Sequence, residues 1–369
     1  MTKEKYGFVL RALDFLISNL VIGPLVVLYW RGTLELMGLY LLPESFKLSC
    51  WISLIFGVTI VTAANLLQFV FSRASVRSSR VRFAAFSRPY TYIVGLAIVN
   101  HWRGVWFLLD AYTGNDWISA MVSLIVGSGL LFALRSFRNV LAPPVVVVLD
   151  IFPETHFIIP TRFKQQKRNV LFTLDVLFSV VVIESLIIVT WRGLWELLDL
   201  YLFPDDTLKS GYYAFIISYV LVLLIQIAEN PLQTISKKLE HTTMTGKVIF
   251  DDVIYLLQAA VAICHKRGLW LILNVVFFPS DQELSLWLNH AIGAGGLLLM
   301  CTLNSALPKG ILIDGAQMDG AGVTMSISYA AVIVQWFRNR NSKEKQPSTE
   351  KVEMEQEQIT FNPTAGAAV

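Results

Sequence analysis

Four arginines stand where a long apolar stretch ends, and a glycine follows each of them. They are Arg31, Arg103, Arg192 and Arg267. A fixed guanidinium charge at such a place can anchor a helix at a membrane surface beside interfacial tryptophans, or it can hold a carboxylate or another anion. The recurrence of the pair predicts a collar of four arginines at one end of the molecule.

Carboxylates accompany only two of these arginines. Glu35 and Glu196 each follow an arginine by four residues, a spacing at which two side chains meet on one helix face. Apolar residues occupy that place after Arg103 and Arg267. We expect these two arginines to reach a glutamate of a neighbouring segment or to face an anion. In the first case the collar is a salt-bridged structural element, which is the interpretation we favour.

Glu184 differs from these groups, because it lies near the middle of the apolar run "FSVVVIESLIIV". A carboxylate at membrane depth is costly, so it marks either a functional site or a neutral side chain bonded to a neighbouring helix. His101 and His265 each precede an arginine by two residues. Two histidines make no metal site without a third ligand, which leaves a proton-sensing pair or an interfacial role. We expect neither a metal nor a cofactor.

Four asparagines close the second apolar run that follows each arginine. They are Asn65, Asn139, Asn230 and Asn304. We expect their side chains to satisfy backbone carbonyls where helices end. The alternative is that they line the inner mouth of a ring of helices.

The sequence patterns of common enzymes are absent. No P-loop, nucleophile elbow, H-E-x-x-H or C-x-x-C pattern occurs, and each of these would place a specific reactive group. The filter pattern of potassium channels is also missing. We therefore expect a protein that is not an enzyme.

The elements that position these residues follow from hydropathy. The chain has 369 residues, of which 55% are hydrophobic and only 15% charged, whereas soluble domains carry roughly 25% charged residues. This composition predicts an integral protein of the lipid bilayer, and a net charge of +3 gives no indication of nucleic-acid binding. A span needs about 20 apolar residues. The candidates are 14–31, 49–71, 86–103, 117–134, 170–191, 211–229, 249–265 and 286–306.

Basic residues gather on one side of this eight-span arrangement. They lie at the N-terminus and within 73–88, 135–168, 237–247 and 338–345. The positive-inside rule makes that side cytoplasmic, so we expect a cell-membrane protein with both termini in the cytoplasm. The arginine–glycine segments then lie at the outer face.

An internal repeat organises the spans. The segments Trp30–Pro43 and Trp191–Pro204 are identical at 9 of 14 positions without a gap, and "HWRGVW" and "HKRGLW" are weaker copies. The order is A-B-A′-B′, a duplicated half that itself holds two related units. We expect an all-α membrane fold of four parallel helical hairpins, with short outer interfacial half-helices and a small cytoplasmic layer. The glycines are interpreted as the breaks at which the half-helices begin.

The duplication also divides the chain. We expect a first membrane half at 1–140, a cytoplasmic linker at 141–169 and a second membrane half at 170–306. Residues 307–340 are expected at the cytoplasmic surface, although Gly322–Phe337 is apolar enough to raise the question of a ninth span. The polar tail 341–369 is expected to be disordered, and its terminal Val369 is a candidate for capture by a partner domain.

The phrases "YWRGTLELMGLYLLP" and "TWRGLWELLDLYLFP" resemble the Fuseless family of animal multi-pass membrane proteins, over most of residues 8–306. The resemblance implies a presynaptic protein that supports calcium-channel localisation and transmitter release, with voltage-gated calcium channels or synaptic scaffold proteins as partners. It supplies no catalytic residues. The residues themselves leave an alternative open, a channel or carrier for an ion or small solute along the axis between the hairpins.

Overall fold

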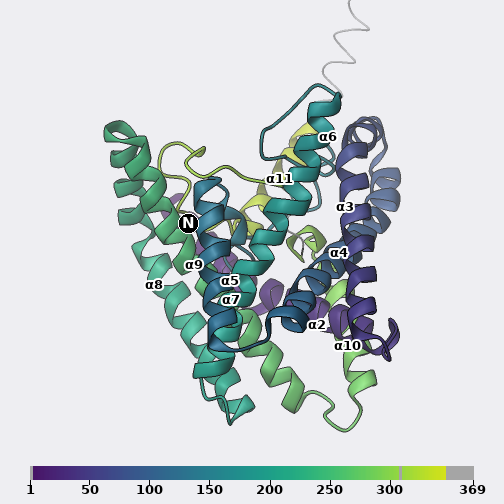
Figure 1. The fold of residues 1–369 in the computed structure, drawn as a ribbon. Helices are drawn as coiled ribbons and strands as arrows, with labels where there is room; N and C mark the ends of the chain where they lie inside the picture. Colours follow the sequence, from purple (N-terminus) through teal and green to yellow (C-terminus); the bar gives the residue numbers. More distant parts are fainter. Residues whose placement is uncertain (1–2, 307–309, 346–369) are drawn as a thin grey trace, which may run out of the picture. The chain divides into compact units, whose positions relative to one another are not determined.

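The computed structural model describes residues 3–306 and 310–345, and Figure 1 shows its helices. These residues form two compact units, which are described separately. The smaller unit joins residues 3–15 to 328–345, and the larger unit holds Leu16–Ile327. Residues 346–369, including Val369, lie outside the described part, and so does most of the tail predicted to be disordered.

The smaller unit consists of the first part of α1 (Lys3–Ile17) and of α11 (Tyr329–Lys345). The Asp14 carboxylate accepts a hydrogen bond from the backbone N–H of Ala330. This bond satisfies one of the N–H groups that are left free at a helix start. Gly322–Phe337 is not one continuous helix, because the chain is irregular up to residue 328 and helical from Tyr329.

The larger unit is helical, and among its described residues no β-strand forms. Its long helices are α2 (Gly23–Tyr40), α3 (Phe46–Val76), α4 (Arg80–Thr113), α5 (Trp117–Ala133), α7 (Ser185–Tyr201), α8 (Thr207–Thr242), α9 (Met244–Val276) and α10 (Gln282–Leu299). The π-helical segments η1 (Ser18–Ile22) and η3 (Phe178–Glu184) lead into α2 and α7, the second from the short α6 (Val170–Leu177). Two 3-10 turns, η2 (Phe137–Val140) and η4 (Leu303–Ala306), follow α5 and α10.

Six continuous helical stretches among the described residues are long and apolar enough to cross a membrane. They are Gly7–Tyr40, Phe46–Val76, Arg80–Thr113, Val170–Tyr201, Thr207–Thr242 and Met244–Val276. The α5 helix is apolar but shorter, and α10 has only 18 residues. The all-α class and a multi-pass membrane architecture therefore agree with the prediction.

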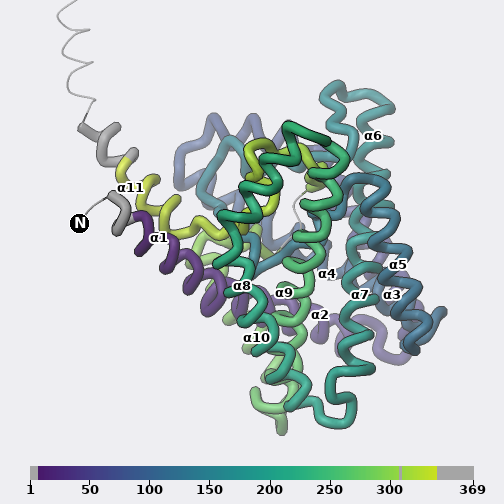
Figure 2. The backbone as a smooth tube through the Cα atoms, turned by 90° about the vertical axis from the view of Figure 1, so that its left-hand side faces the viewer, coloured from purple at the N-terminus to yellow at the C-terminus, as the bar shows by residue number. Residues whose placement is uncertain are grey.

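The long helices pack as an inner ring of four, with one outer helix against each. The helices that carry the arginines, α2, α4, α7 and α9, contact one another in that cyclic order. Each of them also packs along an outer helix, in the pairs α2–α10, α4–α3, α7–α5 and α9–α8. Figures 1 and 2 both show α8 beside α9. The contact between α9 and α2 closes the inner ring, and the α2–α10 pair joins the first and last long helices of this unit.

This packing corrects the expected hairpins. The two helices of each sequence unit, for example α2 and α3, are joined by a short turn yet hardly touch, and each packs against a neighbouring unit instead. Sequence proximity predicts pairing across a short connection. The helices separate here because small residues that allow close approach lie on the faces toward the neighbouring units, as the glycine contacts below show.

The expected outer half-helices are also corrected. The α2, α4, α7 and α9 helices continue without a break past their arginine–glycine pairs and end at Tyr40, Thr113, Tyr201 and Val276. A glycine inside a helix costs about 1 kcal/mol relative to alanine. Its presence in four continuous helices indicates that the missing side chain serves packing.

The helices end instead at four short turns, 41–45, 114–116, 202–206 and 277–281, which we call the turn face. Each turn contains one residue with positive φ, which stops the helix. These residues are Leu42, Gly114, Phe203 and Phe278. Aspartates then cap three of the outer helices through their side chains, as when Asp116 accepts from the N–H of Ser119 at 2.8 Å.

At the opposite end of the larger unit, two aspartates cross-connect the halves. Asp314 accepts from the backbone N–H groups of Phe137 (2.7 Å) and Arg138 (2.9 Å) at the start of η2. Asp150 accepts from Asn304 N–H in η4 at 3.2 Å. Burial raises the pKa of Asp314, although these N–H groups oppose the shift. The segment that follows each half therefore caps the short helix of the other half.

Candidate functional site

Glycine contacts set the distance between each inner helix and its outer partner. A Cβ atom added after any of the four arginines would lie under 3.0 Å from atoms of the outer helix. The glycines are Gly32 against α10, Gly104 against α3, Gly193 against α5 and Gly268 against α8. Such close approach is typical of helix pairs in membranes. It also places each arginine directly at the seam between two helices.

At three of the four arginines, the Nε atom donates a hydrogen bond to a side chain at an equivalent position of the neighbouring inner helix. Arg192 Nε donates to Asp110 Oδ1 at 2.7 Å, and Arg267 Nε donates to Asp199 Oδ1 at 2.7 Å. Arg31 Nε donates to Asn274 Oδ1 at 2.8 Å. Each acceptor lies seven residues after the arginine of the preceding unit, so the collar is linked around the ring.

Arg103 is the exception, because the equivalent position of its neighbouring inner helix carries no acceptor. The position seven residues after Arg31 is Gly38, which offers no side chain. Arg103 Nε accordingly has no hydrogen-bond partner among the described residues, although Arg103 is only 2% exposed. An unmet buried donor costs about 1–3 kcal/mol, so this seam is expected to be the weakest of the four.

Serines of the outer helices bind the other guanidinium nitrogens. Arg103 donates to Ser53 Oγ at 2.7 Å and to Ser49 Oγ at 2.9 Å, and Arg192 donates to Ser123 Oγ at 3.0 Å. Ser210 and Ser285 do the same for Arg267 and Arg31. The sequence holds this signal as Ser-x₃-Ser-x₃-Gly in α3 and α5, with variants in α8 and α10. Sequence reasoning missed it.

The predicted pairs of arginine with the glutamate four residues later do not form among the described residues. Arg31 and Arg192 face the seams instead. A buried guanidinium is stabilised only where several fixed acceptors surround it, and the seams provide them. Glu35 and Glu196 line a central cavity, where Trp270 and Trp106 lie beside them.

A layer of four side chains crosses the middle of the inner ring. Its members directly precede the arginines and are Trp30, Trp102, Trp191 and Lys266, which we call the Trp/Lys layer. Trp102 meets Trp30 and Trp191 edge to face, with ring centroids 5.2 and 5.5 Å apart. The Nζ atom of Lys266 lies 5.1 Å from the Trp30 ring centre and 4.7 Å from that of Trp191. Lysine thus takes the place of a fourth tryptophan.

Hydrogen bonds fix this layer to the opposite end of the unit. Trp30 Nε1 donates to the carbonyl of Ala306 at 2.8 Å, and Trp191 Nε1 donates to the carbonyl of Val140 at 2.9 Å. Both carbonyls belong to the 3-10 turns η4 and η2. The layer and the turns therefore form one rigid floor.

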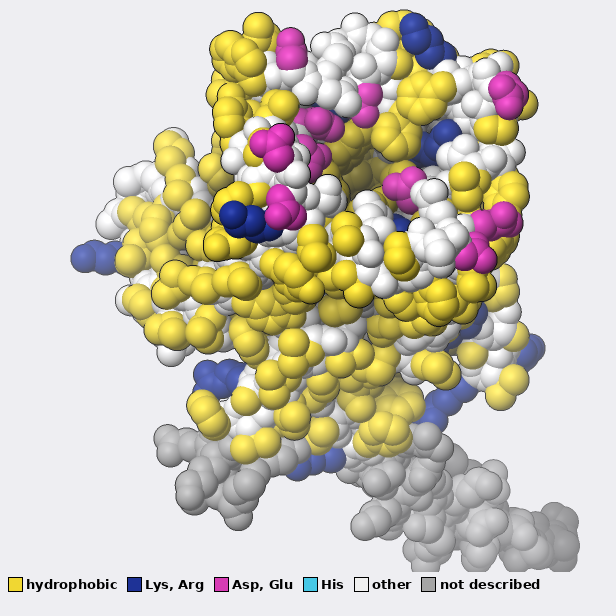
Figure 3. Space-filling view, turned by 90° about the horizontal axis from the view of Figure 1, so that it is seen from below, with side chains coloured by type: hydrophobic (Ala, Val, Ile, Leu, Met, Phe, Trp, Pro, Cys, Tyr) yellow, Lys and Arg dark blue, Asp and Glu magenta, His cyan; other side chains and the backbone are white. Residues whose placement is uncertain are grey.

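A cavity of ≈ 240 Å³ lies on the turn side of this floor and is lined only by the inner helices. We call it the axial cavity. Trp195 stands between Trp106 and Trp270 in its wall, with centroid distances of 5.8 and 5.9 Å. Figure 3 shows the turn face, where acidic side chains gather around a hollow. The cavity therefore combines indole walls, two glutamates and one ammonium group.

A smaller cavity of ≈ 50 Å³ lies on the other side of the floor, and it is lined by the same four residues of the Trp/Lys layer. Residues of 139–148, Ile187, Ser305 and Ala306 complete its lining. The layer stands between the two cavities. Among the described residues the axis therefore holds two separate cavities, with this layer between them.

Glu184 lies away from the axial cavity, at the contact between the inner helices α4 and α7. His101 Nδ1 is 3.5 Å from its Oε2 atom, and His101 Nε2 is 3.2 Å from Ser185 Oγ. At the equivalent contact between the inner helices α9 and α2, Gly23 takes the place of the glutamate. Both ring nitrogens of His265 there lack a partner among the described residues. Among the described residues no three metal-ligating side chains come together.

The four asparagines occupy two kinds of place. Asn139 and Asn304 lie in the 3-10 turns, where Asn139 Nδ2 donates to the carbonyls of Ser136 and Leu312, both at 2.8 Å. Asn65 and Asn230 lie inside α3 and α8, which continue past them. None of the four lines the axial cavity, but Asn139 lines the smaller cavity on the other side of the floor.

Comparison with known proteins gives one match. The model of the Fuseless family matches residues 9–307. No curated protein and no solved structure matches significantly. The matched range contains all four arginines, the Trp/Lys layer and the eight long helices of the larger unit. The chain belongs to the Fuseless family.

Proposed function

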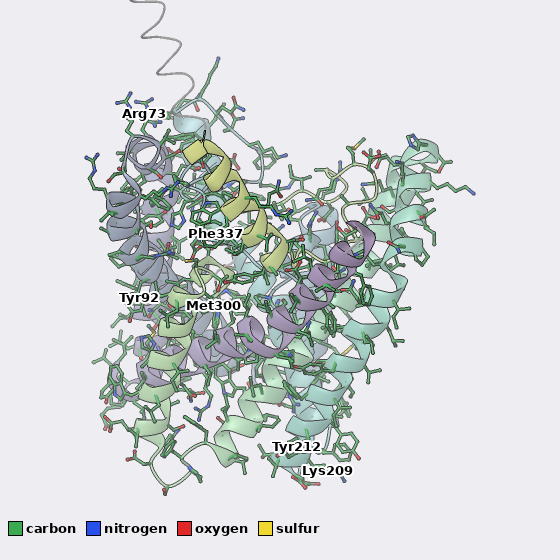
Figure 4. The ribbon with its side chains drawn as sticks, turned by 180° about the vertical axis from the view of Figure 1, so that it is seen from behind. Arg73, Tyr92, Lys209, Tyr212, Met300 and Phe337 are labelled. Carbon is green, nitrogen blue, oxygen red and sulfur yellow. The ribbon has the colours of Figure 1, made fainter. Side chains whose placement is uncertain are left out.

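We propose that the chain crosses the cell membrane eight times, with the turn face outside and both termini in the cytoplasm. The α5 and α10 helices then serve as the two shorter spans, because they pack along α7 and α2. The distribution of charge supports this orientation. Figure 4 shows Arg73 and Lys209 at opposite ends of the larger unit, and Arg73 belongs to the basic cluster 73–88 far from the turns.

Cysteine labelling tests this orientation. The native cysteines Cys50 and Cys264 are buried and Cys301 is partly buried, so the background is low. A cysteine introduced at Asp205 in a turn should react with an impermeant maleimide on intact cells, and one at Ser78 should react only after permeabilisation. The reverse pattern would overturn the orientation.

The role we propose is the organisation of presynaptic terminals, including the localisation of voltage-gated calcium channels. Membership of the Fuseless family carries this proposal. The rigid floor between the two cavities supports a scaffold more than a conducting pore. Such a scaffold acts by presenting fixed surfaces to channels or to synaptic scaffold proteins, and it needs no catalysis.

Removal and re-expression test this role. Terminals that lack the chain should show fewer calcium channels at release sites and weaker evoked release, and the wild-type chain should restore both. A conservative surface variant such as Asp205→Asn serves as an expression-matched control. Normal channel density after removal would contradict the proposal.

A second candidate is a channel or carrier for an ion or small solute, and the axial cavity is the observation that favours it. The Trp/Lys layer opposes it, because a solute would have to displace two hydrogen-bonded tryptophans. Purified protein in liposomes should therefore give no flux above empty liposomes. Flux that is altered by Lys266→Met would favour the carrier over the scaffold.

A further inference from the structure

Carboxylates and one ammonium group line the axial cavity. They belong to Glu35, Glu196, Asp110 and Lys266. Asp110 is already paired with Arg192 at 2.7 Å, whereas neither glutamate forms an ion pair among the described residues. A cationic ligand would therefore meet two carboxylates on the cavity wall.

The cavity walls suit a particular kind of cation. Indole rings from three of the four inner helices stand around the two glutamates, namely Trp106, Trp195 and Trp270. The faces of such rings attract substituted ammonium ions, because these ions are poorly hydrated and keep their charge. A small hydrated metal cation would gain less from indole faces, which offer no oxygen ligands. The volume of ≈ 240 Å³ accommodates a small organic molecule.

An indole of the neighbouring helix lies beside each glutamate. Trp270 lies beside Glu35, and Trp106 lies beside Glu196. Neither carboxylate forms an ion pair with the arginine on its own helix, since those arginines are bound at the seams. Both retain lone pairs for a ligand N–H group or charge for a quaternary ammonium.

We propose that the axial cavity is a binding site for a small substituted ammonium ion, which enters from the turn face. The cation lies among Trp106, Trp195 and Trp270, with Glu35 and Glu196 as its counter-charges. Lys266 forms the floor and limits the depth that the cation reaches. The site does not depend on the proposed synaptic role, since binding requires neither transport nor a protein partner.

Binding is measured on the full chain in nanodiscs, with choline as the probe and tryptophan fluorescence as the readout. Choline should change the fluorescence saturably. Its uncharged isostere 3,3-dimethylbutan-1-ol should bind at least about tenfold more weakly, because it keeps the shape and loses the charge. Equal affinity for the two molecules would overturn the proposal.

Three variants locate the site. Glu196→Gln should weaken choline binding about tenfold, and Trp270→Leu, which copies Leu34 of the first unit, should weaken it severalfold. Asp205→Asn is the matched control, because it removes one negative charge from an exposed turn residue outside the cavity. If Glu196→Gln and Asp205→Asn weaken choline binding equally, the effect comes from surface charge and the proposed site is wrong.

Lys266→Met separates this proposal from binding of an anion. Removal of the floor ammonium should strengthen choline binding severalfold, because a like charge is lost. If the cavity instead binds a carboxylate through Lys266, Lys266→Met should abolish binding of 3,3-dimethylbutanoate. Choline should then leave the tryptophan fluorescence unchanged. Size-exclusion profiles and helical circular dichroism establish whether each variant is folded. If Glu196→Gln does not fold, Glu35→Gln provides a second test.

Discussion

The seams at Arg192 and Arg103 are built to one plan, but the preceding helix and its turn provide acceptors only at Arg192. At Arg192 the guanidinium meets Asp110, Ser119 and Ser123. At Arg103 two serines are present, but the aspartate position of the preceding helix is Gly38, and Nε is left without a partner. The glycine crossing is the same in both. Close packing therefore places the arginine, and the acid decides how well its charge is met.

The largest expected effect comes from removing the arginine where its partner is an acid. Arg192→Met leaves the Asp110 carboxylate half-buried without its counter-charge, and it should lower the free energy of unfolding by about 3–5 kcal/mol. Arg103→Met leaves only serine hydroxyls and should cost clearly less. Denaturant unfolding in detergent micelles measures both. Equal losses would show that the aspartate contributes little to the seam.

A slightly smaller loss should follow from filling the crossing itself. Gly193→Ala places a Cβ under 3.0 Å from Leu124 of α5, and the forced separation should cost about 1–3 kcal/mol. Gly129→Ala is the control, because nothing lies within 4 Å of a Cβ there. Thermal unfolding of the two variants compares them. A neutral Gly193→Ala would mean that the helices can move apart freely.

The weak seam can be repaired. Gly38→Asp supplies the missing acceptor at the position of Asp110 and Asp199, and a Cβ at Gly38 meets nothing within 4 Å. We expect a gain of about 1–2 kcal/mol from a charged hydrogen bond to Arg103 Nε and from the loss of a helical glycine. In an Arg103→Met background the same substitution should keep only the part of the gain that comes from the loss of the glycine. An equal gain in both backgrounds would assign all of it to helix propensity.

The smallest effect should come from an exposed ion pair, which sets the lower end of the scale. Lys237 Nζ lies 2.8 Å from Asp319 Oδ1, with side chains 52% and 76% exposed. Lys237 lowers the pKa of Asp319, so any stabilisation is present at neutral pH and is lost as pH falls through the lowered pKa. Lys237→Met should leave unfolding at neutral pH unchanged within error. A measurable loss that disappears in high salt would contradict this.

Much of the frame was predictable from the sequence. The repeat located four equivalent arginines, and hydropathy located the long helices that carry them. The acceptors seven residues after three of the arginines were visible as polar residues in apolar surroundings, as were the serines at intervals of four. Their purpose was not visible, because each bonds to an arginine of another unit, at a distance of 50 to 254 residues in the chain.

Only part of the helix pairing could be predicted in the same way. Short connections favour packing between consecutive helices, and this holds for α3–α4 and α8–α9 but not for α5–α7 and α2–α10. The glycines resembled helix breaks. A glycine can end a helix or allow two helices to approach closely. Only the position of the opposing backbone of α3, α5, α8 or α10 shows which of the two applies.

The sequence by itself determined a helical membrane protein with four related units, each marked by an arginine at a fixed place in its helix. Local hydropathy and repetition suffice for that, because they act within one segment. Only the tertiary structure decided that neighbouring units pack together, that the arginines turn to the seams, and that three tryptophans and a lysine lie between the two cavities of the axis. Those outcomes depend on which side chains meet across the ring, and no single segment contains that information.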